Sequence, residues 1–210
     1  MKKILIALGF TMVAMSSQAA TLSLDVIGPV VFTTVVHSPT GAHDVITGAL
    51  GGVFGTLSVD SDTIFRATFL GKEANDVNFY MANGSNVAGS GINVDPGSVN
   101  VGDSFEFAVS AGIINFGFND LTTGVSSSNV DDSINKIAYI TNNGTYIDAA
   151  TGNPYAFLIG FNDSGSLDGD YDDYVVGVSA VPVPAALPLM ASALGAFGIA
   201  RRRNKAKAAK

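Results

Sequence analysis

Cysteine and tryptophan are absent from the 210-residue sequence, which also contains only two histidines. Without cysteine the chain has no disulfide bridges, no thiolate ligands for zinc or iron–sulfur clusters, and no thiol nucleophile. The absence does not argue against export, because a domain of this size buries a core large enough to fold without bridges.

Positive charge is scarce in the middle of the chain. Eight of the 11 Lys and Arg residues lie at the two ends, whereas all 18 acidic residues lie between Asp25 and Asp173. Residues 20–180 therefore carry 18 acids against three bases, a net charge of −15. Since nucleic-acid binding requires a basic surface, we expect no nucleic-acid partner.

The N-terminus has the three parts of a secretory signal peptide. Two lysines follow Met1, residues 4–14 form a short apolar run, and small residues Ser17 and Ala19 precede Ala20. This pattern predicts a signal peptide over residues 1–19, cleaved between Ala19 and Ala20, with a buried N-terminal helix as the alternative. We therefore expect an exported protein whose folded module spans residues 20–180.

The C-terminus also has three parts. The proline-rich motif Val181, Pro182, Val183, Pro184 and Ala185 precedes an apolar segment over residues 186–200, and the basic tail 201–210 begins with Arg201, Arg202 and Arg203. A helix over residues 185–200 would be about 24 Å long, slightly short of the membrane's hydrocarbon core. The arginines should act as a stop-transfer signal and stay on the cytoplasmic side of a short transmembrane helix.

This C-terminus resembles the PEP-CTERM sorting signal, in its variant with a Val-Pro-Leu-Pro-Ala motif. The resemblance implies recognition by an exosortase-type membrane enzyme near Pro182–Ala185, followed by cleavage or transfer, in the envelope of a Gram-negative bacterium. Val183 departs from the commonest form of the motif, which has glutamate there. The alternative is a plain C-terminal anchor.

The sequence pattern between the two ends predicts an all-β module. It has short apolar runs separated by Gly, Asn, Asp and Ser, no convincing repeat, and no long amphipathic helix pattern, which favours an antiparallel β-sandwich. Asn142-Asn143-Gly144 predicts a turn. The expected strands lie at residues 63–70, 105–109, 113–118, 136–141, 155–161 and 174–178, with one or two more in 22–36, broken near Gly28-Pro29.

Five carboxylates fall within residues 163–173. Carboxylates this close raise one another's pKa and destabilise a fold unless a cation neutralises them, and Ca²⁺ is the cation that oxygen-rich sites most often bind. The segment is not an EF-hand loop starting at Asp168, because Asp173 stands where that loop needs glycine and Ser179 where it needs glutamate. A solvated acidic loop is the alternative.

The same segment resembles an acidic element that precedes the sorting signal in many PEP-CTERM proteins, in a β-sandwich domain thought to bind calcium. The resemblance implies a set of calcium ligands in this chain. They are Asp163, Asp168, Asp170 and Asp173, with Asn162 or Asp172 as helpers.

No pattern in the module indicates catalysis. His37 and His43 lie among Thr and Ser in a spacing typical of a polar loop, and Glu73 and Glu106 are the only glutamates. We therefore expect no enzyme, but an exported protein of the cell envelope or the exopolysaccharide matrix, stabilised by calcium. The alternative is a calcium-dependent carbohydrate-binding or adhesive module, for which Tyr80, Tyr146, Tyr155 and Tyr171 are the candidate aromatic platform.

Overall fold

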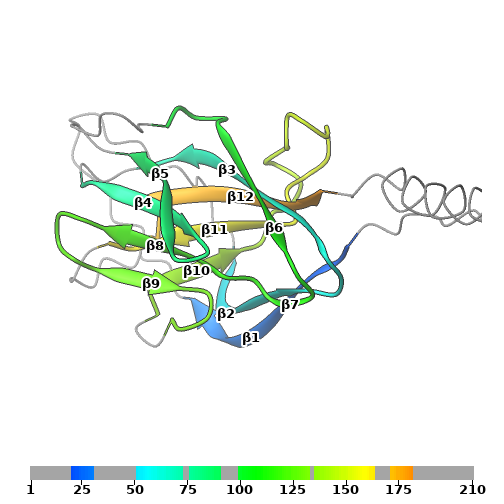
Figure 1. Ribbon diagram of the computed structural model, residues 1–210, viewed down its shortest axis with the longest axis horizontal. Coiled ribbons are helices and arrows are strands. Elements are labelled where there is room, and N and C mark those ends of the chain that lie inside the picture. The colour runs from blue at the N-terminus through cyan, green and yellow to red at the C-terminus, as the bar shows by residue number, and fades with distance from the viewer. Residues whose placement is uncertain are drawn as a thin grey trace, which may run out of the picture. The chain divides into compact units, whose positions relative to one another are not determined.

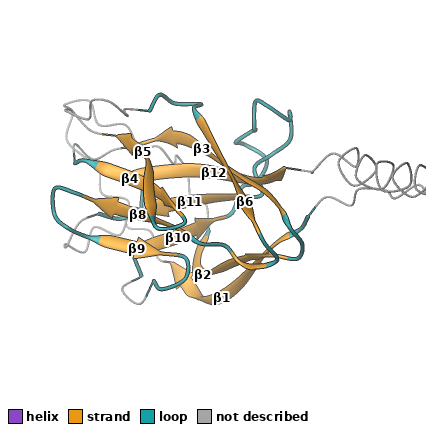
Figure 2. Cartoon of the chain, viewed as in Figure 1, coloured by secondary structure: helices purple, strands orange, loops and turns teal. Residues whose placement is uncertain are grey.

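The computed structural model describes residues 20–30, 51–72, 76–90, 99–132, 135–163 and 171–181. They all belong to one compact unit that spans Ala19–Pro182. Within these ranges every regular element is a β-strand and there is no helix, as Figure 2 shows. The expected all-β class is therefore confirmed for the part of the chain that the structure describes.

The twelve strands of the described ranges form two antiparallel sheets (Figure 1). The larger sheet has the order β1-β2-β10-β11-β12-β3-β6, with β7 paired to β2, and the smaller has the order β5-β4-β8-β9. The strands are β1 (Leu22–Val30), β2 (Gly52–Val59), β3 (Thr63–Gly71), β4 (Asn78–Ala82), β5 (Ser85–Ser90), β6 (Ser104–Val109), β7 (Gly112–Ile113), β8 (Phe116–Asp120), β9 (Ser126–Ser128), β10 (Ile137–Ile140), β11 (Phe157–Phe161) and β12 (Tyr174–Val181).

One aromatic core lies between the two sheets. Phe118 of the smaller sheet stacks on Phe161 of the larger one, with ring centroids 5.1 Å apart, and also meets the edge of Tyr174 at 5.7 Å. Phe116 of the smaller sheet likewise stacks on Phe65 of the larger. The alternation of β3 explains this packing, because Phe65, Ala67 and Phe69 all point into the same buried cluster.

A second apolar cluster covers the outer face of the larger sheet. It contains Ala138, Ile140 and Leu158 of the central strands, under Tyr155 and Tyr171. β10 and β11 are therefore covered on both faces, which is why they read as continuous apolar runs rather than alternating ones.

Gly160 allows the backbone at Tyr171 to pack closely against β11. A Cβ atom at residue 160 would lie 2.0 Å from the backbone oxygen of Tyr171, so no side chain fits there.

Several local features differ from the sequence-based expectation, and strands β2 and β9 lie outside the expected ranges. β1 continues through Gly28-Pro29, where a register shift between Val26 and Gly28 replaces the expected break. The run 113–118 is divided between β7 and β8. The hairpin β4–β5 was not expected; its turn is Asn83-Gly84, where both residues have positive φ, as a two-residue type I′ turn requires.

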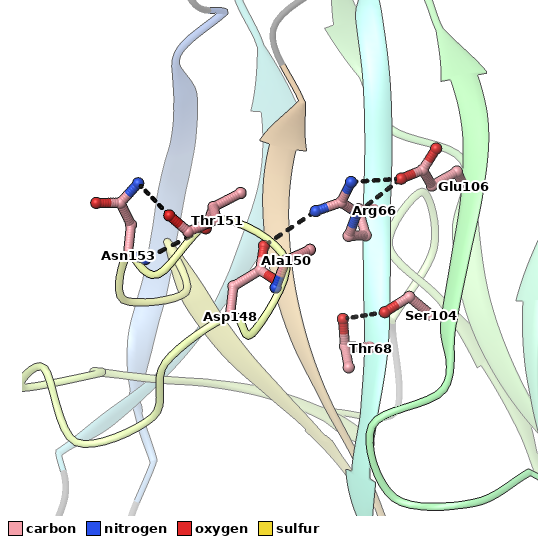
Figure 3. Close-up of polar contacts among 8 residues, drawn as sticks. All are labelled: Arg66, Thr68, Ser104, Glu106, Asp148, Ala150, Thr151 and Asn153. Atoms are coloured by element: carbon pink, nitrogen blue, oxygen red, sulfur yellow. Dashed lines mark hydrogen bonds and ion pairs between the residues drawn. The ribbon is translucent and has the colours of Figure 1, made fainter.

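The connection from β10 to β11, residues 141–156, is a long loop rather than a tight turn. Near its start, the Asn142 side chain accepts a hydrogen bond from the Tyr146 amide and donates one to the Tyr146 carbonyl. Arg66 of β3 holds the loop through Asp148 at 3.3 Å and also pairs with Glu106 of β6 at 2.6 Å (Figure 3). A neighbouring pair, Thr68 and Ser104, links β3 to β6 by a hydrogen bond.

Both ends of the described chain lie at the same end of the two sheets (Figure 1). Leu22 pairs with Val59 and Val181 pairs with Ile64, on either side of the turn that joins β2 to β3. At the opposite end β3 finishes, β11 finishes and β12 begins, since Phe161 pairs with Tyr174. The candidate site lies at this opposite end.

Candidate metal centre

Three carboxylates from distant parts of the chain meet at this end of the sheets. Asp76, Asp120 and Asp163 each offer one carboxylate oxygen, and these oxygens all lie within 4.8 Å of one another. Asp120 and Asp163 are buried, whereas Asp76 is half-buried. Two oxygens bound to one Ca²⁺ at about 2.3–2.6 Å are at most about 5 Å apart, so the spacing fits a shared ion.

The smaller sheet positions Asp120. It is the last residue of β8 and pairs with Asn78, the first residue of β4. The backbone amides of Thr122 and Thr123 donate to its two carboxylate oxygens at 2.7 and 2.9 Å, and the Thr123 hydroxyl donates as well. Asp120 thus closes the turn that follows its own strand, and this fixes the carboxylate group at the sheet end.

The larger sheet positions Asp163, which follows β11 by two residues. Its backbone amide donates to the Asp173 carboxylate at 2.8 Å. Its own side chain accepts a hydrogen bond from Asn78 Nδ2 at 2.5 Å, across to the smaller sheet. Asp76 lies in the segment that joins β3 of the larger sheet to β4 of the smaller sheet. The three carboxylates therefore come from both sheets and from a segment that connects them.

The electrostatics of the cluster favour a bound cation. Burial raises the pKa of Asp163 above its usual 3.8, and the charges of Asp76 and Asp120 raise it further, while interactions with Asn78 and Asp173 oppose the shift. Burial also lowers the pKa of Lys72, against the opposing influence of Asp76 and Asp163. An ion that neutralises the three carboxylates would relieve both the repulsion and part of the cost of burial.

Of the expected ligands that the structure describes, only one belongs to this cluster. Asp163 is a member, but Asp173 instead accepts the backbone amide of Asp163. Asn162 and Asp172 are both buried, and the Asn162 backbone amide bonds the Lys136 carbonyl. Asp168 and Asp170 lie outside the described residues.

Asp76 and Asp120 were not expected, although the sequence contains a signal for one of them. The tetrapeptide Gly-Phe-Asn-Asp occurs twice, at residues 117–120 and 160–163. The first copy forms the last four residues of β8 in the smaller sheet, and the second extends two residues beyond the end of β11 in the larger sheet. The two phenylalanines stack on each other, and the two terminal aspartates meet in the cluster. The expectation of no repeat overlooked this short one. Asp76 carries no comparable signal.

The aromatic residues considered for carbohydrate binding do not form an exposed platform. Tyr80, Tyr155 and Tyr171 are buried in the two apolar clusters, and Tyr146 is half-buried. His37 and His43 lie outside the described residues.

Most residues of the two terminal signals also lie outside the described ranges. Ala20 is half-buried and packs against the main core, and Val181 is the last residue of β12, where its carbonyl accepts a bond from the Thr63 hydroxyl at 2.9 Å. Ala19, Pro182–Ala185 and Arg201–Arg203 are not described. Within the described ranges no helix is long and apolar enough to cross a membrane.

Comparison with protein-family models, curated proteins and solved structures gives no match.

Proposed function

We propose that this chain is an exported, non-enzymatic protein of the cell envelope or the exopolysaccharide matrix, whose β-sandwich module is stabilised by a calcium ion bound by Asp76, Asp120 and Asp163. The observation that carries the proposal is the convergence of these three carboxylates, two of them buried, at one end of the sheets. Carboxylate oxygens are the ligands that Ca²⁺ prefers, and water can complete its sphere of about 6–8 oxygens.

The sorting part of the proposal rests on the two terminal sequence patterns. In this proposal a signal peptide over residues 1–19 directs export, the apolar segment 186–200 holds the protein briefly in the inner membrane, and an exosortase-type enzyme acts near Pro182–Ala185. The fold is compatible with this order, because β12 ends at Val181, where the motif begins. The three carboxylates lie at the end of β12 opposite Val181.

Burial of the cluster favours a stabilising ion over one that bridges to carbohydrate. A bridging ion needs ligands open to a polymer, but Asp120 and Asp163 are 0% and 3% exposed. Three of the four tyrosines considered for a sugar-binding platform are buried as well. We therefore place the calcium-dependent carbohydrate-binding module behind the stabilised envelope or matrix protein.

Thermal unfolding of the full chain in a nonionic detergent, with millimolar Ca²⁺ or with EDTA, tests the calcium part. An ion bound only by the folded state adds about 2.7 kcal/mol when its concentration is about 100 times Kd. For a chain of this length that corresponds to a rise in the midpoint of roughly 5–10 °C.

Asp120→Asn should abolish the rise, and Asp25→Asn, which changes an exposed carboxylate of β1, should preserve it. Equal midpoints of the wild-type protein in Ca²⁺ and in EDTA would contradict the proposal.

A further inference from the structure

Among the residues that the structure describes, only the Nδ2 group of the Asn78 side-chain amide makes hydrogen bonds. Asn78 is fully buried, and its Nδ2 donates to Asp163 Oδ2 at 2.5 Å and, more weakly, to the Asp173 carbonyl at 3.4 Å. Its Oδ1 is also buried, and no hydrogen-bond donor within the described ranges reaches it. A buried amide oxygen without a partner costs free energy, because it has given up its bonds to water.

Asn129 shows that this fold satisfies a buried asparagine completely elsewhere. Asn129 is 2% exposed, and its Oδ1 accepts bonds from the Leu57 amide at 2.7 Å and from the Tyr139 hydroxyl. Its Nδ2 donates to the carbonyls of Leu57 and Ile114 at 2.8 and 2.6 Å. The unused oxygen of Asn78 is therefore a feature of its own position rather than of buried asparagines in this protein.

That position lies between two of the three carboxylates of the metal centre. Asn78 stands directly opposite Asp120 in the pairing of β4 with β8, and its Nδ2 contacts Asp163. We propose that Asn78 Oδ1 is the fourth protein ligand of the metal centre; the inference rests on the calcium site described above. In this proposal Asn78 Oδ1 binds the ion beside the carboxylate oxygens of the cluster.

An amide oxygen suits this place chemically. Ca²⁺ accepts Asn carbonyl oxygens alongside carboxylates. A fourth carboxylate would add another negative charge to a buried cluster in which Asp76 and Asp120 already raise the pKa of Asp163. The amide adds an oxygen without that charge. Electrostatic repulsion in the metal-free protein is therefore weaker than it would be with a fourth carboxylate.

The competing explanation is that Asn78 only holds Asp163 through its Nδ2 donor. The two roles respond oppositely to Asn78→Asp, which removes the donor but keeps an oxygen at the ligand position. Asn78→Ala removes both. A ligand role therefore predicts loss of calcium binding in Asn78→Ala and its recovery in Asn78→Asp, whereas a donor role predicts loss in both.

Isothermal titration of the full chain in nonionic detergent with CaCl₂ alone measures the affinities. We expect Asn78→Ala to raise Kd by roughly tenfold or more, a size typical of lost metal-site contacts. Asn78→Asp should have a Kd equal to or below the wild-type value. Asn119→Ala is the matched control with unchanged Kd, because Asn119 adjoins Asp120 in β8 but points to the other face of the strand.

Several outcomes would overturn the inference. Wild-type binding that is lost in Asp120→Asn but unchanged in a folded Asn78→Ala would remove the fourth ligand and leave the calcium site standing. If Asn78→Ala fails to fold, weak binding by Asn78→Asp would decide against the ligand role. No calcium binding by the wild-type protein would remove both the site and its fourth ligand.

Discussion

Two buried tyrosines of the core differ in whether their hydroxyl group has a partner. Tyr139 donates its hydroxyl to Asn129 Oδ1, which is itself held by the Leu57 amide. The hydroxyl of Tyr80 is equally buried and has no hydrogen-bond partner within the described ranges. Both residues belong to the core cluster between the sheets, and burial raises the pKa of both hydroxyls.

Phenylalanine substitutions should therefore have opposite effects on the free energy of unfolding. Tyr139→Phe loses a hydrogen bond and leaves Asn129 partly unsatisfied, which should cost about 1–2 kcal/mol. Tyr80→Phe removes an unpaired polar group and should leave stability unchanged or raise it by about 1 kcal/mol. Urea denaturation of both variants checks this; equal losses would show that the Tyr80 hydroxyl has a partner in solution.

The connection between β10 and β11 depends on Arg66, at the scale of whole elements. Arg66 is only 13% exposed and makes two ion pairs of different kinds. Asp148, in the loop, is 2% exposed, whereas Glu106, on β6, is 47% exposed. A buried carboxylate depends on its cation far more than an exposed one, because water cannot replace the partner.

Removing the guanidinium should therefore cost much more than removing the exposed carboxylate. We expect Arg66→Met to lower the free energy of unfolding by about 3 kcal/mol, since Asp148 is left buried and unpaired. Glu106→Gln should change it by less than about 1 kcal/mol. Urea denaturation measures both, and a loss in Glu106→Gln as large as in Arg66→Met would contradict the assignment.

Strands could be predicted where apolar residues alternate or form a short continuous run, and β5 was missed because it has neither pattern. In β3 and β6 the apolar residues recur at every second position, so both strands and their inward faces agree with the sequence-based expectation. β5 was missed because Ser85–Ser90 has little apolar character, and its pairing with β4 depends on the Asn83-Gly84 turn. β1 passes Gly28-Pro29 because Pro is tolerated on an edge strand next to a bulge.

At the scale of the whole molecule, the proposed calcium site and the strand end that precedes the proposed processing motif lie at opposite ends of the sheets. Thr21 and Val181, near the two limits of the described residues, lie at one end of the sheets, where the Thr21 carbonyl accepts a bond from the Asp60 amide and the Val181 carbonyl one from the Thr63 hydroxyl. The acidic cluster lies at the other end. The proposed processing of the terminal segments should therefore leave the proposed calcium site undisturbed.

The mature protein should lack both terminal signals. We expect protein from its native host to begin at Ala20 and to end within residues 182–185, as intact-mass spectrometry would show. Replacement of Pro182 and Pro184 by Ala should block only the C-terminal step, because both follow the last residue of β12. A mature chain from Ala20 to Lys210 would contradict sorting by an exosortase-type enzyme while leaving export intact.

The sequence alone indicated the strands β3, β6, β10, β11 and β12 and the inward faces of β3 and β6, because these properties depend on neighbours within one strand. It also yielded Asp163 as a candidate ligand. Only the tertiary structure decided that Asp163 clusters with Asp76 and Asp120, while Asp173 accepts the Asp163 amide. It also decided that Asn78 pairs with Asp120 and contacts Asp163. The physical reason is that these carboxylates lie where two sheets and a crossing segment converge, and no local pattern along the chain encodes which distant strand ends will meet.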